Sequence, residues 1–332
     1  MCSSDLTTHS AQSGAVAQTW TSNATMPAWA SQTDGTYQVR ATAIDRAGNT
    51  FSGTAVSFTL DNTAPVTASV TSPVGGGIYR GASMPAAYGG SVADNSTGVG
   101  LAANSATITI RRNSDGWYWS GSAWASSVTN LATTHAATTD GTTVGWSRTV
   151  TITWASQTSG SYTIQAKATD RVGNVLTGTA ITFTLDNNAP TTASVTSPVS
   201  GTTLRGASVP TSTGLAADNA TGVGLAADST TITIKRNADG WYWNGSTWQS
   251  TVFALATSHS ATTDGTAVSW TRTSGLVPWA SQSDGTYTIT ATVTDRVGNT
   301  LTGTAAASTF TLDNTSPTVV GITRAGANPT NA

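Results

Sequence analysis

The sequence predicts an all-β chain built of tandem β-sandwich repeats. Whole phrases return about every 125 residues: FTLDN stands at 58–62, 183–187 and 310–314, and DRAGN at 45–49 returns as DRVGN at 170–174 and 295–299. Such self-similarity indicates an array of like modules. The composition disfavours helix, because charged residues make up only 9% of the chain and glutamate is absent. The abundant Thr, Ser, Val, Trp and Tyr fit a pleated surface instead.

Alternating segments predict the individual strands. In 286–294 apolar residues alternate with threonines, which is typical of a strand with one buried face. The same alternation occupies 162–169, and further alternating runs lie at 181–185, 108–110 and 232–234. DRVGN between two of these runs is a turn-forming loop. With no helical period anywhere, a sandwich or a barrel is the main option.

The tryptophans follow the repeats. WYWNGSTW at 241–248 places Asn-Gly between aromatic flanks and predicts a hairpin with a two-residue turn. We expect most of the 12 tryptophans to be core. In the hairpins, alternation puts pairs of tryptophans on one strand face, where an exposed aromatic row could stack on sugar rings. Covering the edge of an extended sandwich is the alternative. The candidate glycan-binding residues are Trp117, Trp119, Trp241 and Trp243.

A resemblance favours the sandwich over the barrel. DGTYTI at 284–289, with DGTYQV at 34–39 and SGSYTI at 159–164, resembles the immunoglobulin tyrosine corner. There a Tyr opens the penultimate strand, and an inward position follows two residues later, here Val39, Ile164 or Ile289. Together with T-D-R-x-G-N and F-T-L-D-N-x-x-P, the phrase resembles the bacterial Ig-like (Big-type) repeats of large secreted or surface-anchored proteins, adhesins among them.

This resemblance implies tandem immunoglobulin-like β-sandwich repeats in an extracellular or cell-surface protein. We expect the C-terminal part of a truncated repeat at 1–62, complete repeats at 63–187 and 188–314, and the start of a further β module at 315–332. A unit of about 125 residues exceeds the roughly 100 of an Ig domain, and we expect the Trp-rich hairpin to hold the excess. Residues 1–6 (MCSSDL) match no later repeat and read like a translated sequencing adaptor, so we interpret them, with the only cysteine, Cys2, as an assembly artefact.

Aspartates are the candidate metal ligands. In an Ig topology the B–C loop, the F–G loop and the entry to the first strand lie at one pole, and these carry Asp94, Asp170 and Asp61. Their carboxylates would then converge at the junction with the preceding module. Hard oxygen ligands from several loops suit calcium, which would stiffen the linker. Ordinary turn residues that bond their own backbone are the alternative. The second unit repeats the set as Asp186, Asp218 and Asp295.

Other function classes are disfavoured. A net charge of −2 without a cluster of Lys or Arg gives no footprint for nucleic acid, and no stretch is apolar enough to span a membrane. His9, His135 and His259 recur one per repeat, so we expect surface or turn histidines and no catalytic site. The sequence therefore predicts a non-catalytic structural or adhesive stalk. Its partners would be neighbouring Ig-like modules and a cell-surface glycan or protein receptor. The alternative is a carbohydrate-binding array that serves an enzyme elsewhere in the parent chain.

Overall fold

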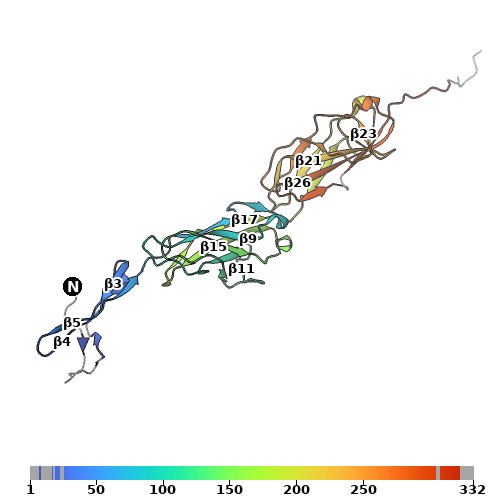
Figure 1. Cartoon of the computed structure of the whole chain (residues 1–332). Helices are drawn as coiled ribbons and strands as arrows, with labels where there is room; N and C mark the ends of the chain where they lie inside the picture. The colour runs from blue at the N-terminus through green and yellow to red at the C-terminus, as the bar shows by residue number, and fades with distance from the viewer. Residues whose placement is uncertain (1–6, 9–16, 18, 23–25, 304–306, 322–332) are drawn as a thin grey trace, which may run out of the picture.

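A computed structural model describes residues 7–8, 17, 19–22, 26–303 and 307–321 of the 332-residue chain. These residues form β-strands and short 3-10 turns, with no α-helix among them, so the all-β prediction is confirmed. Three parts follow one another end to end, a short N-terminal part and two complete sandwiches (Figure 1). The expected artefact at 1–6, His9 and residues 322–332 of the expected further β module lie outside the described residues.

The N-terminal part consists of paired ribbons. β3 pairs with β6 and β4 with β5, while β1 pairs with β2. The bounds are β1 Thr7–Thr8, β2 Thr21–Ser22, η1 Trp29–Ser31, β3 Gly35–Val39, β4 Thr42–Ile44, β5 Thr50–Ser52 and β6 Val56–Leu60. Val39 was expected to point inward, but it is 44% exposed. Its strand pairs only with β6, so no facing sheet covers it among residues 26–62.

The first complete sandwich has a three-stranded and an eight-stranded sheet. The small sheet has the order β14-β9-β7, and the large one β12-β11-β10-β15-β17-β8, with β13 on β10 and β16 on β15. The bounds are β7 Thr67–Ser72, β8 Ile78–Tyr79, η2 Gly81–Ser83, β9 Ala87–Ala93, β10 Thr107–Arg112, β11 Tyr118–Trp119, β12 Trp124–Ala125, β13 Leu131–Ala132, β14 Val144–Thr149, η3 Trp154–Ser156, β15 Gly160–Thr169, β16 Val175–Thr177 and β17 Ile181–Leu185.

The second sandwich repeats this topology. Its small sheet is β18-β20-β25, and its large sheet β19-β28-β26-β21-β22-β23, with β24 on β21 and β27 on β26. The bounds are β18 Thr192–Ser197, β19 Thr203–Leu204, η4 Gly206–Ser208, β20 Thr213–Ala217, β21 Leu225–Arg236, β22 Trp241–Trp243, β23 Trp248–Gln249, β24 Leu255–Ala256, β25 Val268–Thr271, η5 Trp279–Ser281, β26 Gly285–Asp295, β27 Thr300–Thr302 and β28 Ser308–Leu312.

The period-two alternation explains the core. Along β15 every second residue is buried, and along β26 the same holds. These inward residues meet those of the small sheet in one apolar cluster per sandwich. Ile164 and Ile289, the positions two after the tyrosine, have no exposed surface, as predicted. Burying one such side chain contributes roughly 1.5–3 kcal/mol.

The tyrosine corner is present in all three parts. The hydroxyl of Tyr162 donates to the carbonyl of Thr158 (2.7 Å), and that of Tyr287 to the carbonyl of Ser283 (2.8 Å). Tyr37 repeats the bond, to Thr33. These corners fix the start of β3, β15 and β26, and with the two packed sheets of each complete sandwich they establish tandem immunoglobulin-like β-sandwiches.

The Trp-rich hairpin forms, but its turn differs from the prediction. Trp243 pairs with Trp248, so four residues and not two connect β22 to β23. The side-chain oxygen of Asn244 accepts from the N–H groups of Ser246 (3.0 Å) and Thr247 (2.8 Å). Because Asn244 bonds the backbone two and three residues on, Asn-Gly begins a longer loop in place of the two-residue turn.

Candidate metal centre

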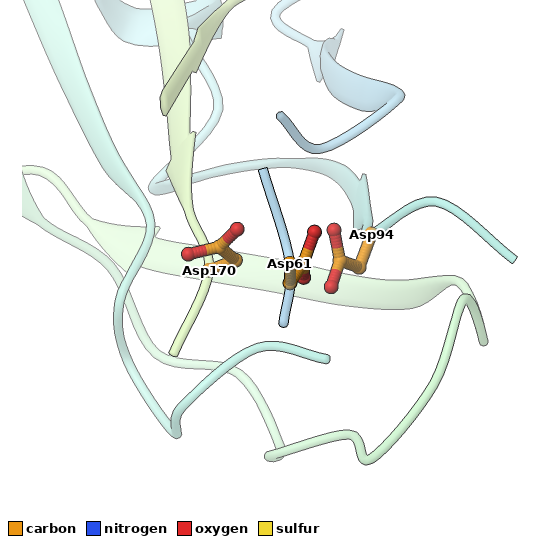
Figure 2. Close-up of side chains that lie close together, drawn as sticks. All are labelled: Asp61, Asp94 and Asp170. Carbon is orange, nitrogen blue, oxygen red and sulfur yellow. The ribbon is translucent and has the colours of Figure 1, made fainter. Parts of the chain in front are cut away.

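Three aspartates meet at the start of the first complete sandwich. Asp61 follows β6, Asp94 follows β9, and Asp170 follows β15. One carboxylate oxygen from each lies within 4.8 Å of the others. Figure 2 shows the three side chains gathered from three separate segments. Asp61, Asp94 and Asp170 are 6%, 1% and 4% exposed, so this group of carboxylates is buried.

The second sandwich repeats the group. Asp186, Asp218 and Asp295 also bring carboxylate oxygens within 4.8 Å of one another, and they are 0%, 1% and 4% exposed. In each trio one aspartate comes from the chain that enters the sandwich, and two stand at the ends of its strands, directly after the strand except for Asp295, the last residue of β26. The sequence-based expectation that these six residues form two groups at the entry poles matches their positions.

Neither trio has a cationic partner. Across the described residues the ion pairs are Arg112 with Asp115 and Arg236 with Asp239, both at the Trp-rich hairpins. Burial raises the pKa of Asp94 above its usual range, and the charges of Asp61 and Asp170 push it the same way. The pKa of Asp218 is raised for the same reasons. Three like charges held this close favour either a proton or a cation between them.

Backbone N–H groups hold the first trio in place. Val99 donates to Oδ2 of Asp61 (2.9 Å), and Gly100 donates to Oδ2 of Asp94 (2.7 Å). Oδ2 of Asp170 accepts from the side-chain amide of Asn174 (2.8 Å). Within the described part of the chain each of these Oδ2 atoms accepts one hydrogen bond. A carboxylate oxygen has two lone pairs, so each retains one that can bind a cation.

The second trio has the same hydrogen bonds. Val223 donates to Asp186 Oδ2 (3.0 Å), Gly224 to Asp218 Oδ2 (2.7 Å) and Asn299 to Asp295 Oδ2 (2.7 Å). Three carboxylates with free lone pairs form a donor set of hard oxygens, which is the chemistry that Ca²⁺ requires. Donated N–H bonds also favour the ionised form of each carboxyl. The residues present therefore fit a divalent cation.

A glycine closes each B–C loop over its aspartate, and sequence reasoning missed it. A Cβ at Gly98 would lie 2.3 Å from Oδ2 of Asp94, and one at Gly222 would lie 2.2 Å from Oδ2 of Asp218. No side chain fits there without moving the carboxylate. The signal was available, because DNSTGVG at 94–100 returns as DNATGVG at 218–224.

The Asp-Asn pair between modules holds both sides of the junction. Asp186 accepts from Val223 in the sandwich that follows. Asn187 binds the sandwich that precedes, because its side-chain amide donates to the carbonyls of Trp154 (2.8 Å) and Gln157 (2.9 Å). Its Oδ1 also accepts from Gly81 N–H (2.7 Å). The N–H of Asp186 also donates to the carbonyl of Tyr79 in the preceding sandwich (2.7 Å), so Asp186 bonds to both modules and Asn187 to the preceding one, which restricts movement of the linker.

Two further bonds cross the same junction. Arg80 of the first sandwich donates from Nη1 to the carbonyl of Gly298 in the F–G loop of the second (2.9 Å). Asn299 in that loop donates to the carbonyl of Asp186 (3.0 Å). DRVGN therefore both supplies an aspartate and contacts the neighbouring module.

The four hairpin tryptophans do not form one exposed row. Trp117 and Trp241 are each 42% exposed, but Trp119 (8%) and Trp243 (4%) belong to the cores. Nε1 of Trp243 donates to the carbonyl of Gly275 (2.7 Å), and its ring lies 5.5 Å from that of Trp248. These contacts cover the inner indole, so the prediction of exposure is wrong for Trp119 and Trp243.

The described histidines are buried, so the expectation of a surface position is wrong, although both lie between strands, after β13 and after β24. His135 and His259 are 6% and 8% exposed. Nε2 of His135 accepts from the N–H of Ala106 (3.0 Å), and Nδ1 lies 2.8 Å from the carbonyl of Ala136. A ring that accepts at Nε2 and donates at Nδ1 is the neutral tautomer. Each such histidine satisfies a buried backbone N–H.

Fold and junctions together define the class as tandem immunoglobulin-like modules joined by short aspartate-bearing linkers. Residues 3–62 match the family model described as a bacterial Ig-like domain, which confirms the resemblance expected from the repeated motifs. FTLDN and the DRxGN loop of that matched segment recur in both complete sandwiches. No curated protein matches the chain significantly.

Solved structures similar to the chain include other multi-module β proteins. A 1.5-MDa bacterial ice-binding adhesin, in a study of its retention on the host cell surface, is 16% identical with a TM-score of 0.37, covering 89% of this chain and 79% of that one. The fibronectin(III)-like modules of Clostridium thermocellum CbhA are 11% identical with a TM-score of 0.26, covering 74% and 93%. Mouse clustered protocadherin PcdhgC3 EC1-3 is 12% identical with a TM-score of 0.31, covering 84% and 76%.

Proposed function

We propose that this chain is a non-catalytic stalk segment of a large exported bacterial protein, in which calcium at the module junctions stiffens a row of Ig-like sandwiches. The proposal rests on one observation above all. Within the described residues, two buried aspartate trios share the same hydrogen-bond pattern and have no cationic side chain as partner, and each joins the entering chain to two segments at the ends of strands of the next sandwich. In such an array each module contacts mainly its neighbours, so the modules form an extended rod. A stiff rod of this kind can hold a distant part of the protein away from the cell and can repeat weak contacts along its length.

The junction chemistry supports stiffness. One carboxylate of each trio lies on the residue that directly follows the last strand of the preceding part, and two lie at the ends of strands of the following sandwich. A cation bound by all three carboxylates would hold the modules together. It would also offset the repulsion between the three negative charges. No helix in the described ranges could span a membrane. Location at the cell surface or outside the cell is part of the proposal, and it rests on the bacterial Ig-like match at 3–62.

Calcium titration of the full chain tests the proposal. In calorimetry after chelator treatment we expect about two Ca²⁺ bound per chain and a higher melting temperature with calcium, because a ligand of the folded state alone must stabilise it. The double variant Asp94→Asn, Asp218→Asn should lose both effects. Asp140→Asn, Asp264→Asn is the matched control, since both residues are exposed loop aspartates outside the trios. If calcium left the melting temperature of the wild type unchanged, these aspartates would be ordinary turn residues that bond their own backbone.

Carbohydrate binding is a second candidate, and one observation favours it. Trp117 and Trp241 occupy the same place in successive modules and are equally exposed, at 42%. One indole per module would give weak contacts that multiply along the array. Retention of the full chain on insoluble polysaccharides and peptidoglycan, lost in Trp117→Ala, Trp241→Ala, would support it. Equal behaviour of the wild type and this variant would remove the candidate.

A further inference from the structure

The tip of the second Trp-rich hairpin carries an Asn-Gly step. Asn244 and Gly245 stand directly after β22, and this dipeptide occurs once in the whole sequence. Asn244 is half-buried, whereas Ser246 and Thr247, the next residues of the loop, are exposed. Solvent water therefore reaches the loop around the Asn244 side chain. The matching place in the first sandwich is Ser120, which has no side-chain amide.

The side-chain carbonyl of Asn244 is surrounded by hydrogen-bond donors. Its Oδ1 accepts from the N–H groups of Ser246 (3.0 Å) and Thr247 (2.8 Å), and also from the hydroxyl of Ser246 (3.1 Å). Donors gathered on one carbonyl oxygen polarise the carbonyl and stabilise negative charge that develops on the oxygen, as in an oxyanion hole. Cγ of Asn244 is therefore an activated electrophile.

The backbone nitrogen of Gly245 is the nucleophile beside this carbon. The bond from the N–H of Ser246 to Oδ1 of Asn244 closes a ring of atoms that includes both Cγ and the nitrogen of Gly245. Among the described residues the N–H of Gly245 has no hydrogen-bond partner. Gly245 has φ +102° and no Cβ, so no side chain crowds its nitrogen. Attack of this nitrogen on Cγ forms a succinimide ring.

The leaving nitrogen has a hydroxyl within reach. Nδ2 of Asn244 donates to Oγ1 of Thr247 (3.1 Å) and to Oε1 of Gln249 (3.1 Å). Once Cγ becomes tetrahedral, this nitrogen is basic, and the hydroxyl of Thr247 can rotate to give it a proton. Such proton delivery to a departing group is general acid assistance. The loop thus surrounds one amide with a polarised carbonyl, an unbonded nucleophile and a proton donor.

We propose that Asn244 is a modification site, at which the folded chain deamidates through a succinimide. The nitrogen of Gly245 loses its proton to water and bonds to Cγ of Asn244, while the Cγ–Nδ2 bond breaks and ammonia leaves. Water then adds to either imide carbonyl and opens the ring, which gives aspartate or isoaspartate at position 244. The net reaction consumes water and releases ammonium. This site is independent of the aspartate trios and of any role in a stalk.

The modification changes the tip of the hairpin. A carboxylate at position 244 lacks the N–H groups that bind Thr247 and Gln249, and it would place a negative charge beside Oε1 of Gln249. The loop is closed at its base by the pairing of Trp243 with Trp248. Conversion should therefore loosen the loop above that pair. Because ammonia is lost to the solvent, the modified form accumulates with the age of the molecule.

Peptide mass spectrometry of the aged full-length chain tests the proposal. The native protein is incubated at neutral pH, and the replacement of amide by acid is followed at each asparagine. We expect conversion at Asn244 to be at least about tenfold faster than at Asn113. Asn113 is also half-buried, but it precedes a serine, and its Oδ1 accepts from the hydroxyl of Thr163 and from no backbone N–H in the described residues. The product at 244 should contain isoaspartate, which direct hydrolysis of the side chain cannot form.

Two variants separate the chemistry of the loop from a general loss of structure. Gly245→Ala should slow conversion at Asn244 about tenfold, because a Cβ crowds the attacking nitrogen and restricts the backbone. Thr247→Val removes the proton donor and should slow conversion about threefold, which keeps the test decisive if Gly245→Ala fails to fold. Thr143→Val is the matched control, since Thr143 is an exposed loop threonine of the first sandwich, and it should leave the rate unchanged.

Urea unfolding establishes that each variant is folded before its rate is compared. Equal rates at Asn244 and Asn113 in the native chain would overturn the proposal. A product that contains aspartate without isoaspartate would also overturn it, because the amide would then be hydrolysed directly by water. An undiminished rate in folded Gly245→Ala would exclude attack by the backbone nitrogen in the same way.

Discussion

Tyr287 combines two kinds of stabilisation in one side chain. Its ring is 1% exposed, lies 5.0 Å from Trp279 and stacks 6.0 Å from Phe310, and its hydroxyl bonds the carbonyl of Ser283. Tyr287→Ala should lower the free energy of unfolding of the second sandwich by about 3–5 kcal/mol, and Tyr287→Phe by only about 1 kcal/mol. Urea unfolding measures both.

The first sandwich is the internal control for these variants. Its core cluster shares no residue with that of the second, so its own unfolding step should stay within about 0.5 kcal/mol. Tyr162→Ala should reverse the pattern. Equal losses in both steps would mean that the modules unfold as one unit.

The pKa shifts of Asp94 and Asp218 give the stability a pH dependence with a definite sign. Both pKa values lie above the ordinary 3.8, chiefly through burial. A carboxyl with a raised folded pKa stabilises the fold below the unfolded value, and this contribution is lost as pH rises through the folded pKa. In chelator, the stability of the wild type relative to Asp94→Asn, Asp218→Asn should therefore fall as the pH rises above the ordinary value of 3.8 and through the raised pKa values of the folded state.

Calcium should reverse that slope. A bound cation favours the ionised carboxylates, so the relative stability of the wild type should rise with pH over the same range. Thermal melts of both proteins in chelator and in calcium give the two curves. Parallel curves in the two media would contradict an ion at the trios.

The trios were predictable from the sequence because they depend on topology alone. Strand order sends the B–C and F–G loops to one pole, and the repeat gives each loop one aspartate at a fixed place. Which hairpin tryptophans are buried was harder to predict from the sequence. Trp241 and Trp243 share a strand, yet only Trp243 is covered, by the turn at Gly275. That turn comes from 32 residues further along the chain, and periodicity within the hairpin carries no information about it.

At the scale of the element, the β22–β23 hairpin depends on one backbone conformation. Gly245 has φ +102°, and a Cβ there would meet no atom closer than 3.7 Å. Gly245→Ala should therefore destabilise the second sandwich by strain and not by a clash, by about 1–2 kcal/mol. Ser246→Ala in the same loop should stay within about 0.5 kcal/mol. The urea midpoint for unfolding of the second sandwich is measured for both variants. Equal midpoints for Gly245→Ala and Ser246→Ala would show that the loop relaxes to accommodate the alanine.

The hairpins also show how far turn chemistry reaches in prediction. Asn-Gly correctly marked a chain reversal between aromatic strands. The loop length could not be read from it, because Asn244 uses its side chain to cap the loop. In the first sandwich Ser120 takes that place, and its hydroxyl donates to the carbonyl of Ala123 (2.8 Å). Two different side chains thus support the same four-residue connection.

At the scale of the whole molecule, the short linkers determine how the modules are aligned. Asp186 bonds to both sandwiches, through its N–H to Tyr79 and through its carboxylate to Val223, while Asn187 bonds to the first. Arg80 adds a further bond across the junction. Such a junction should hold the two sandwiches in one orientation, as in the end-to-end arrangement of Figure 1. The sequence indicated the junction through its repeated LDN. It could not indicate that Asp186 bonds to both sandwiches while Asn187 bonds to the first, since these contacts depend on how the chain turns between the modules.

Inserting Gly-Ser-Gly between Asn188 and Ala189 lengthens the chain between Asp186 and the second sandwich. The short linker then no longer holds Val223 against the carboxylate of Asp186. Asp186 and Asn187 would stay on the first sandwich, while the second would be tethered by a longer chain. In chelator we expect the insertion variant to need two alignment tensors in residual dipolar couplings, one per sandwich, where the wild type needs one. Each unfolding step should stay nearly unchanged, because neither core is touched.

Calcium makes this variant a test of how the junction is held. Asp186, Asp218 and Asp295 would still converge if a cation binds all three, and three added residues increase the entropy of closure only slightly. Calcium should therefore restore a single alignment tensor in the insertion variant. It should fail to do so when Asp218→Asn is added, because the remaining carboxylates bind the ion too weakly. Independent sandwiches in calcium would mean that covalent shortness alone, and not a shared ion, keeps the modules in line.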